Sequence, residues 1–238
     1  MSLYRDRGVV LRTIRLGEAD RIVTLMTEGH GKVRAVAKGV RKTKSRFGAR
    51  LEPLGHVALL LYQGRELDVI TQAESVEHFR SVREDLEAVT TAISMLEAVD
   101  QLAQERQSNP RLYAMLVGGL RALASTRSPM VAPSFFLKLL ALEGFEPVLD
   151  QCASCGADAE LVAFDIDEGG ALCRQCRRGP SLSPEALVLM RRILGGGLSG
   201  VLAETDPPGS HDVSLLSARA MEYHLERRLR SLGVLDRA

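Results

Sequence analysis

The stretch Gly29-His30-Gly31-Lys32-Val33-Arg34-Ala35-Val36-Ala37-Lys38 decides how the first part of this chain folds. Its opening Gly-His-Gly is a turn signal, and after it charged and apolar residues alternate with the period of a β-strand. The cations fall on one face and the small apolar residues on the other. We therefore expect a strand that faces a core on one side and carries positive charge outward.

A basic loop follows this strand. From Gly29 to Leu51 the chain has eight cations and no acidic residue, and the cations are Lys32, Arg34, Lys38, Arg41, Lys42, Lys44, Arg46 and Arg50. The second half of the stretch is polar and without periodicity, which indicates an exposed loop. Such a loop would attract a polyanion, although an isolated basic run also occurs as a solvated surface without a specific partner. Phe47 within it would either stack on a base or anchor the loop.

Four more strand patterns accompany the first, over Tyr4–Leu16, Asp20–Thr27, His56–Gln63 and Leu67–Glu74. Five short strands in about 75 residues, with the longest connection between the third and fourth, favour a small closed barrel such as the OB-fold. That fold commonly binds single-stranded nucleic acid in a basic groove. An SH3-like barrel and a five-stranded sandwich are the alternatives.

Beyond residue 80 the pattern changes to helical spacing. The first predicted helix, Glu84–Arg106, has an apolar stripe of Leu86, Val89, Ile93, Leu96, Val99 and Leu102. Cap and stop signals place the next helices after Asn109-Pro110, from Pro133 to Gly144, from Ser183-Pro184 to Gly195, and over His211–Leu232.

The predicted fold is therefore multidomain α+β. An N-terminal OB-fold β-barrel occupies residues 1–80, and an α-helical domain occupies residues 81–151 and 181–238. A four-cysteine zinc ribbon over residues 152–180 is inserted into the helical domain.

The zinc prediction rests on Cys152-Ala153-Ser154-Cys155 and Cys173-Arg174-Gln175-Cys176. Two C-x2-C pairs at this separation match a structural Zn²⁺ site with four thiolate ligands. Four thiolates fill the tetrahedral shell and leave no open position, so the metal would stabilise the fold and not catalyse. Arg174, Arg177 and Arg178 beside the second pair would either contact phosphate or be solvated.

Charge is distributed unevenly along the chain. Residues 1–80 carry 15 Lys and Arg against 9 Asp and Glu, whereas the remaining residues carry 16 against 21. Because exposed charges act over a screening length of about 8 to 10 Å, a formal net charge of +1 does not argue against a nucleic-acid partner. No apolar run approaches the about 20 residues that span a bilayer, and no secretion signal is evident, so we expect a cytoplasmic protein without a membrane partner.

The sequence does not favour an enzyme. Gly29-His30-Gly31-Lys32 lacks the flanking residues of a phosphate-binding loop, and the five histidines show no triad or metal-site spacing. A metal-dependent nuclease would need clustered Asp, Glu and His residues. A second basic pair, Arg191-Arg192, ends a predicted helix, where cations interact favourably with the helix dipole. Capping explains this pair, and a second DNA-contacting patch is the alternative hypothesis.

Taken together, these residues resemble the bacterial RecO recombination mediators. The resemblance rests on the strand series, on Lys44-Ser45-Arg46-Phe47-Gly48 with Leu51-Glu52-Pro53, and on the segment from Leu137 to Pro147 that precedes the cysteines. It covers essentially the whole chain. It implies an OB-fold, a helical domain and, since all four cysteines are present, the metal-bearing form of the family.

The resemblance also implies a function. RecO-like proteins are non-enzymatic, bind single- and double-stranded DNA, anneal complementary strands, contact the C-terminal tail of the single-strand-binding protein SSB, and act with RecR to load RecA. We expect association with the nucleoid. For the SSB tail we hypothesise an apolar surface of Phe135, Phe136 and Leu139 near Lys138 or Arg121. Without the resemblance, an RNA-binding or ribosome-associated OB-fold protein with a zinc ribbon would fit the residues equally well.

Overall fold

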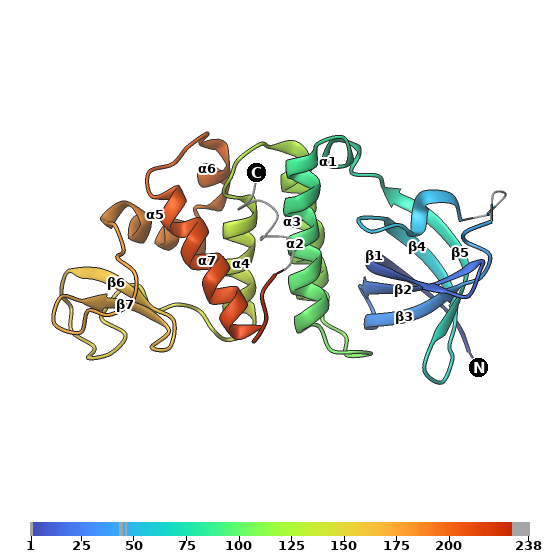
Figure 1. Cartoon of the computed structure of the whole chain (residues 1–238), viewed down its shortest axis with the longest axis horizontal. Coiled ribbons are helices and arrows are strands. Elements are labelled where there is room, and N and C mark those ends of the chain that lie inside the picture. The colour runs from blue at the N-terminus through green and yellow to red at the C-terminus, as the bar shows by residue number, and fades with distance from the viewer. Residues whose placement is uncertain (1, 43–44, 46, 230–238) are drawn as a thin grey trace. The chain divides into compact units, whose positions relative to one another are not determined.

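A computed structural model describes residues 2–42, 45 and 47–229 of the chain. The N-terminal part is a closed barrel of five strands (Figure 1): β1 (Leu3–Leu16), β2 (Asp20–Thr27), β3 (Gly31–Ala37), β4 (His56–Tyr62) and β5 (Asp68–Glu77). The strand order is β1-β2-β3-β5-β4, and the parallel pair of β3 and β5 closes the barrel. The predicted OB-fold is confirmed, and because the barrel is closed the five-stranded sandwich is excluded.

Apolar and charged side chains alternate along β3, and the apolar ones fill the barrel interior, as the sequence predicts. Val33, Ala35 and Ala37 are buried in the barrel core, whereas Lys32 and Arg34 are partly exposed. A short 3₁₀ helix, η1 (Gly48–Leu51), lies between β3 and β4. Phe47 before it is only 1% exposed and belongs to the same core, so this side chain anchors the basic loop and does not stack on a base.

Three helices follow the barrel: α1 (Arg80–Arg83), α2 (Leu86–Leu102) and α3 (Pro110–Ser125). The caps are local, since an Asp85 carboxylate oxygen accepts the N–H groups of Glu87 and Ala88, and Asn109 accepts that of Leu112. The predicted apolar stripe is right for the second half of α2 but wrong for Leu86. That residue is 83% exposed, because the buried part of α2 begins only at Ala92.

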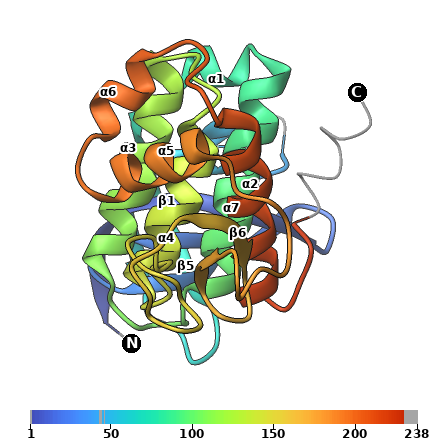
Figure 2. The ribbon, with the colours of Figure 1, turned by 90° about the vertical axis from the view of Figure 1, so that its left-hand side faces the viewer.

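The rest of the chain contains α4 (Val131–Leu142), β6 (Leu161–Asp165), β7 (Gly170–Cys173), α5 (Pro184–Leu194), α6 (Leu198–Ala203) and α7 (Ser210–His224). The apolar α4 packs against α7 and α5 (Figure 2). The hairpin of β6 and β7 carries the second cysteine pair and shares one buried cluster with α5, which includes Phe164, Leu172 and Leu187.

The helices differ from the predicted ones in several places: α1 was not expected, and α2 covers only Leu86–Leu102 of the predicted Glu84–Arg106. Helix α4 begins at Val131, because Pro133 is tolerated within a first turn. The short α6 was not expected, since it is flanked by the glycines that the sequence offers as a stop signal. Helix α7 ends at His224, where Glu226 with φ +51° cannot continue it, and not at Leu232. Residues 230–232 of the predicted helix lie outside the described residues.

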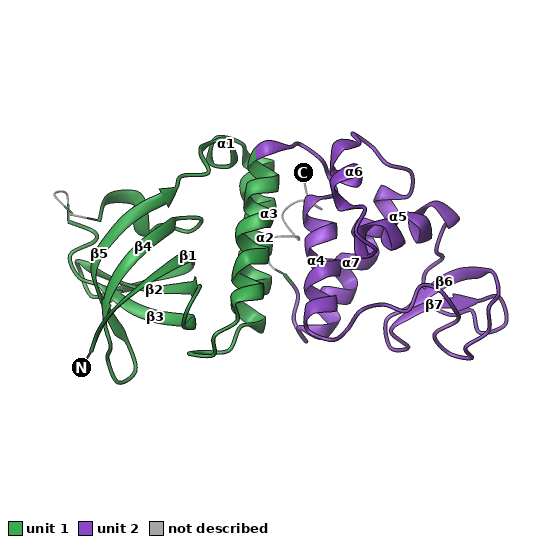
Figure 3. Cartoon of the chain, turned by 180° about the vertical axis from the view of Figure 1, so that it is seen from behind, with its two compact units in different colours: residues 1–124, 229–238 green, residues 125–228 purple. Residues whose placement is uncertain are grey.

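The described residues form two compact units (Figure 3). The first comprises residues 2–124 together with Leu229, and the second comprises Ser125–Arg228. Helices α2 and α3 thus belong to the same unit as the barrel. Compactness alone does not define an independently folding domain, so the boundaries expected at residues 80, 151 and 181 stay predictions. Among the described helices, none is both long and apolar enough to cross a bilayer.

Candidate nucleic-acid interface and metal centre

The four cysteines converge at one point. The sulfur atoms of Cys152, Cys155, Cys173 and Cys176 all lie within 4.8 Å of one another, and those of Cys155 and Cys173 are 3.9 Å apart. A tetrahedral Zn²⁺ with bonds of about 2.3 Å places its sulfurs about 3.8 Å apart, so the cluster fits such an ion. The spacing of the two C-x2-C pairs therefore predicted a real constellation that can bind a metal.

Local backbone turns aim these sulfurs. In the first turn the N–H of Gly156 donates to the carbonyl of Cys152 at 2.8 Å, and Gly156 has φ +71°, a conformation that suits glycine. The N–H of Ala153 donates to Ala171 on β7 at 2.9 Å, which joins the first turn to the hairpin. The second pair follows directly from the end of β7. The hairpin thus carries one pair of thiols to the other.

The thiols are chemically unequal. Backbone N–H groups, that of Cys173 first, lower the pKa of Cys152 to about 6. Hydrogen bonding to the neighbouring sulfurs, that of Cys155 first, raises the pKa of Cys176 to about 12. The thiolate of Cys152 therefore forms readily, whereas its negative charge opposes the formation of a second thiolate beside it. A divalent cation at the centre would compensate this crowding of negative charge, so the donor set suits a metal.

Two of the arginines beside the cysteines are paired with acidic residues close to them in the same segment. Arg174 Nε is 2.9 Å from Glu160, and Arg178 Nε is 2.9 Å from Asp165. Arg178 also contacts Glu168. The sequence left two roles open for these two arginines, contact with phosphate and solvation. The structure shows a third role, in which both arginines pair with acidic residues of the hairpin segment.

The basic loop presents three exposed cations at the exit of β3: Lys38, Arg41 and Lys42. The first turn is fixed to the barrel, since the N–H of Gly39 donates to Asp20 at 2.7 Å and Arg41 donates to the carbonyl of Glu18 at 2.8 Å. Lys44 and Arg46, which were also predicted to bind DNA, lie outside the described residues. Arg50 is exposed on η1 and donates to the carbonyl of Phe47 at 3.3 Å.

The two cations on β3 itself have different surroundings. Lys32 Nζ donates to the carbonyl of Asp100 at 2.6 Å, lies 3.8 Å from its carboxylate and is only 14% exposed. Arg34 is 3.7 Å from Glu105. The same Asp100 carboxylate is 2.5 Å from Arg12. The end of α2 and the α2–α3 connection (residues 103–109) therefore neutralise the charge on this face of the barrel.

Backbone contacts hold the α2–α3 connection on β3. The N–H of Arg106 donates to the carbonyl of Lys32 at 2.9 Å, and Arg106 Nη2 is 2.7 Å from the buried Asp68. A Cβ on Gly31 would lie 1.8 Å from the carbonyl oxygen of Gln107. Sequence reasoning did not find these partners, because an acid at the end of a helix carries no local signal of the strand that it meets.

The second basic pair also has acidic and carbonyl partners. Arg191 donates to the carbonyl of Leu149 at 2.6 Å and lies 3.1 Å from Asp150, and Arg192 is 2.5 Å from Glu204. These contacts tie the end of α5 to neighbouring segments and give both side chains a structural role. Their predicted contact with DNA stays a prediction.

The apolar surface that we hypothesised for the SSB tail does not exist as such. Phe135, Phe136 and Leu139 are 4%, 2% and 0% exposed, because α4 is the central helix of its unit. Of the two cations named with them, Arg121 is 2.8 Å from Glu77 on β5. The hypothesis is wrong in its apolar component, since buried rings cannot receive a peptide.

Comparisons with known proteins agree over the whole chain. The family model "Recombination protein O N terminal" matches residues 1–79, and "Recombination protein O C terminal" matches residues 83–233. A curated relative, the DNA repair protein RecO of Frankia casuarinae, is 44% identical over an alignment of 244 residues that covers 100% of both chains.

Proposed function

The chain belongs to the RecO family of DNA repair and recombination proteins, and from this premise we propose that it anneals complementary single strands and, with RecR, helps to load RecA onto SSB-coated DNA. Proteins of this family are non-enzymatic recombination mediators, in line with a sequence that does not favour an enzyme. The proposed setting is the cytoplasm, at the nucleoid.

The observation that carries the proposal is the exposed cationic loop on a closed barrel. Lys38, Arg41 and Lys42 are exposed, and the turn that bears them is hydrogen-bonded to the β1–β2 turn. Cations in a fixed place can neutralise phosphates without first losing much conformational freedom. If about five side chains, some of them on the loop, contact phosphates, log affinity for a single strand falls with log salt at a slope of about −3 to −4.

Annealing requires little chemistry from such a surface. Two complementary strands repel each other through their phosphates, and a protein that binds them lowers this repulsion and raises their local concentration. Base pairing then supplies the free energy. The barrel needs neither a nucleotide nor a catalytic metal for this step.

We propose Zn²⁺ as the resident metal of the four-cysteine cluster. When bound, it supplies a cross-link between the two ends of the hairpin element and no reactive position. The chain's own contribution is the pair of turns that aim the sulfurs and the buried residues, such as Phe164 and Leu172, that dock the hairpin on the helical core.

The partners RecR, the SSB tail and, indirectly, RecA are part of the proposal through the family alone. Arg191 and Arg192 are proposed as further DNA contacts. Because both are already paired, DNA would have to compete with Asp150 and Glu204 for them. Reversal of charge at both positions without a change in DNA affinity would remove them from the interface.

The test is annealing of complementary SSB-coated oligonucleotides without nucleotide or divalent metal. We expect acceleration by the natural chain and loss of acceleration in Lys38→Glu/Arg41→Glu/Lys42→Glu. The control Arg111→Glu/Arg127→Glu/Arg219→Glu has the same change in net charge at exposed positions outside the loop and should keep the activity. No acceleration by the natural chain contradicts the proposal, and equal or tighter binding of single-stranded RNA would favour an RNA-binding protein instead.

A further inference from the structure

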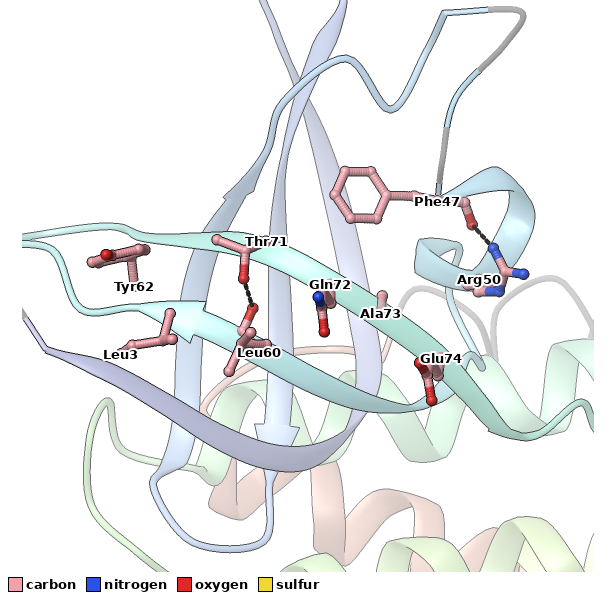
Figure 4. Close-up of a pocket in the computed structure, with 9 residues that line it drawn as sticks. All are labelled: Leu3, Phe47, Arg50, Leu60, Tyr62, Thr71, Gln72, Ala73 and Glu74. Atoms are coloured by element: carbon pink, nitrogen blue, oxygen red, sulfur yellow. Dashed lines mark hydrogen bonds between the residues drawn. The ribbon is translucent and has the colours of Figure 1, made fainter.

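The outer surface of the barrel has a groove beside η1, on the β1–β4–β5 side. Its volume is about 610 Å³, and Leu3, Leu60, Tyr62, Gln72 and Arg50 are among its lining residues. Figure 4 shows Tyr62 and Leu3 toward one end, Arg50 at the other, and Gln72 between them. The groove thus has an apolar end and a cationic end.

The apolar end is a platform of two side chains. Leu3 and Tyr62 are partners in the antiparallel register of β1 and β4, and they are 51% and 45% exposed. Side chains that lie opposite each other on adjacent strands pack together. Two large apolar side chains therefore share a surface that is open to water. An aromatic ring in this position accepts the face of any nucleobase.

The charge around the platform complements a polyanion. By strand alternation Arg5 lies on the same face of β1 as Leu3, and both are exposed. Arg5 is paired in register with Leu60, so it projects beside the groove. Arg50 lines the far end of the groove and Arg5 lies beside it, whereas Glu74 is the one acid among its described lining residues.

The other side of the barrel is less suited to this role. Lys32 and Arg12 share Asp100, Lys32 is only 14% exposed, and Arg34 lies beside Glu105. A phosphate at these cations would have to compete with Asp100 and Glu105 for them. Arg5 and Tyr62 face solvent, and no acidic residue is paired with either in the part of the chain that the structure describes.

From these contacts we infer that single-stranded DNA binds in the β1–β4–β5 groove, with bases stacked on Tyr62 and Leu3 and the backbone alongside Arg5 and Arg50. The inference rests on the proposed DNA binding and gives it a path. Stacking requires unpaired bases, so this groove selects single strands, and the amide of Gln72 can hydrogen-bond a base edge between the two ends.

A local optical probe tests the path directly. The natural chain contains no tryptophan, so Tyr62→Trp introduces a single indole at the platform. Titration with an oligo-dT should quench its fluorescence in parallel with the anisotropy of a labelled strand. The matched control is Leu86→Trp, an 83% exposed position on α2 in the same unit, whose fluorescence should not respond.

Affinity variants supply the second measurement. Tyr62→Ala should lower the affinity for oligo-dT about tenfold, which is about 1.4 kcal/mol, and Tyr62→Phe should restore it. Arg5→Gln should weaken binding and make it less salt-dependent, whereas Arg12→Gln, the same change on the same strand but at a paired arginine, should have a smaller effect. Circular dichroism checks that each variant is folded.

The outcomes separate the two proposals. Binding of DNA by the natural chain with an unresponsive Tyr62→Trp and an unchanged Tyr62→Ala overturns the groove but leaves DNA binding intact. A larger loss in Arg12→Gln than in Arg5→Gln would also overturn it, in favour of the β2–β3 side. Absence of DNA binding by the natural chain overturns both.

Discussion

Removal of the metal from the four-cysteine cluster should unfold its unit at a markedly lower temperature. Cys152 and Cys173 enclose 20 residues, and both are buried. A cross-link around a loop of this length stabilises the folded state by about 3 kcal/mol through the entropy of the unfolded chain. The loss affects the whole unit, because the hairpin buries Phe164 and Leu172 in one cluster with α5.

A loss of about 3 kcal/mol corresponds to a measurable shift in the melting temperature, Tm. For a domain of about 100 residues, 1 kcal/mol moves Tm by about 4 °C or more. We therefore expect the transition of Ser125–Arg228 to fall by about 12 °C or more on chelation, and the transition of the barrel unit to move little. Cys152→Ser should behave like the chelated natural chain and should not respond further to chelator.

The assay is differential scanning calorimetry with and without chelator, followed by restoration of Zn²⁺ and metal analysis of the purified chain. Arg174→Gln is the control, since it removes a largely exposed ion pair from the same hairpin and should change stability by less than about 0.5 kcal/mol. A chain purified without metal, or a Tm that chelation leaves unchanged, would refute the reasoning from loop closure.

Three further predictions concern the barrel unit and are checked by urea unfolding. Gly31→Ala should destabilise it by about 3 kcal/mol, because the new Cβ would lie 1.8 Å from the carbonyl oxygen of Gln107. The control Gly39→Ala has the same φ of +67° but no contact closer than 3.6 Å, so it should cost only about 1 kcal/mol. Equal losses would argue against the packing of the α2–α3 connection on β3. Tyr113→Phe should cost about 1 to 2 kcal/mol, because it leaves the ring of the buried His56 without the hydrogen bond of 2.8 Å, and an unchanged midpoint would contradict this contact. Burial raises the pKa of Asp68, but hydrogen bonds from Tyr4 and Arg106 outweigh burial and hold this pKa below its usual range. The stability that results is therefore present above about pH 4 and is lost as the pH falls. Asp68→Asn should flatten this dependence of stability on acid pH, and an unaltered pH profile would show that Asp68 is not its source.

Sequence by itself determined the features that depend on neighbours along the chain. Alternation with period two placed Val33, Ala35 and Ala37 in a barrel core, because successive side chains of a strand point to opposite faces. Caps such as Asn109 were readable since the side chain bonds a backbone N–H only three residues away. The cysteine cluster was predictable because two residues between thiols suffice to turn both sulfurs toward one point.

Only the tertiary structure decided which charged side chains are accessible. The strand pattern puts Lys32 and Lys38 on the same outward face, yet Lys32 meets Asp100, which is 68 residues away, and Lys38 faces solvent. The burial of Phe47 and the joint exposure of Leu3 and Tyr62 are likewise products of barrel closure. Contacts of this kind depend on how distant segments pack, and a residue's own neighbours in sequence carry no record of that packing.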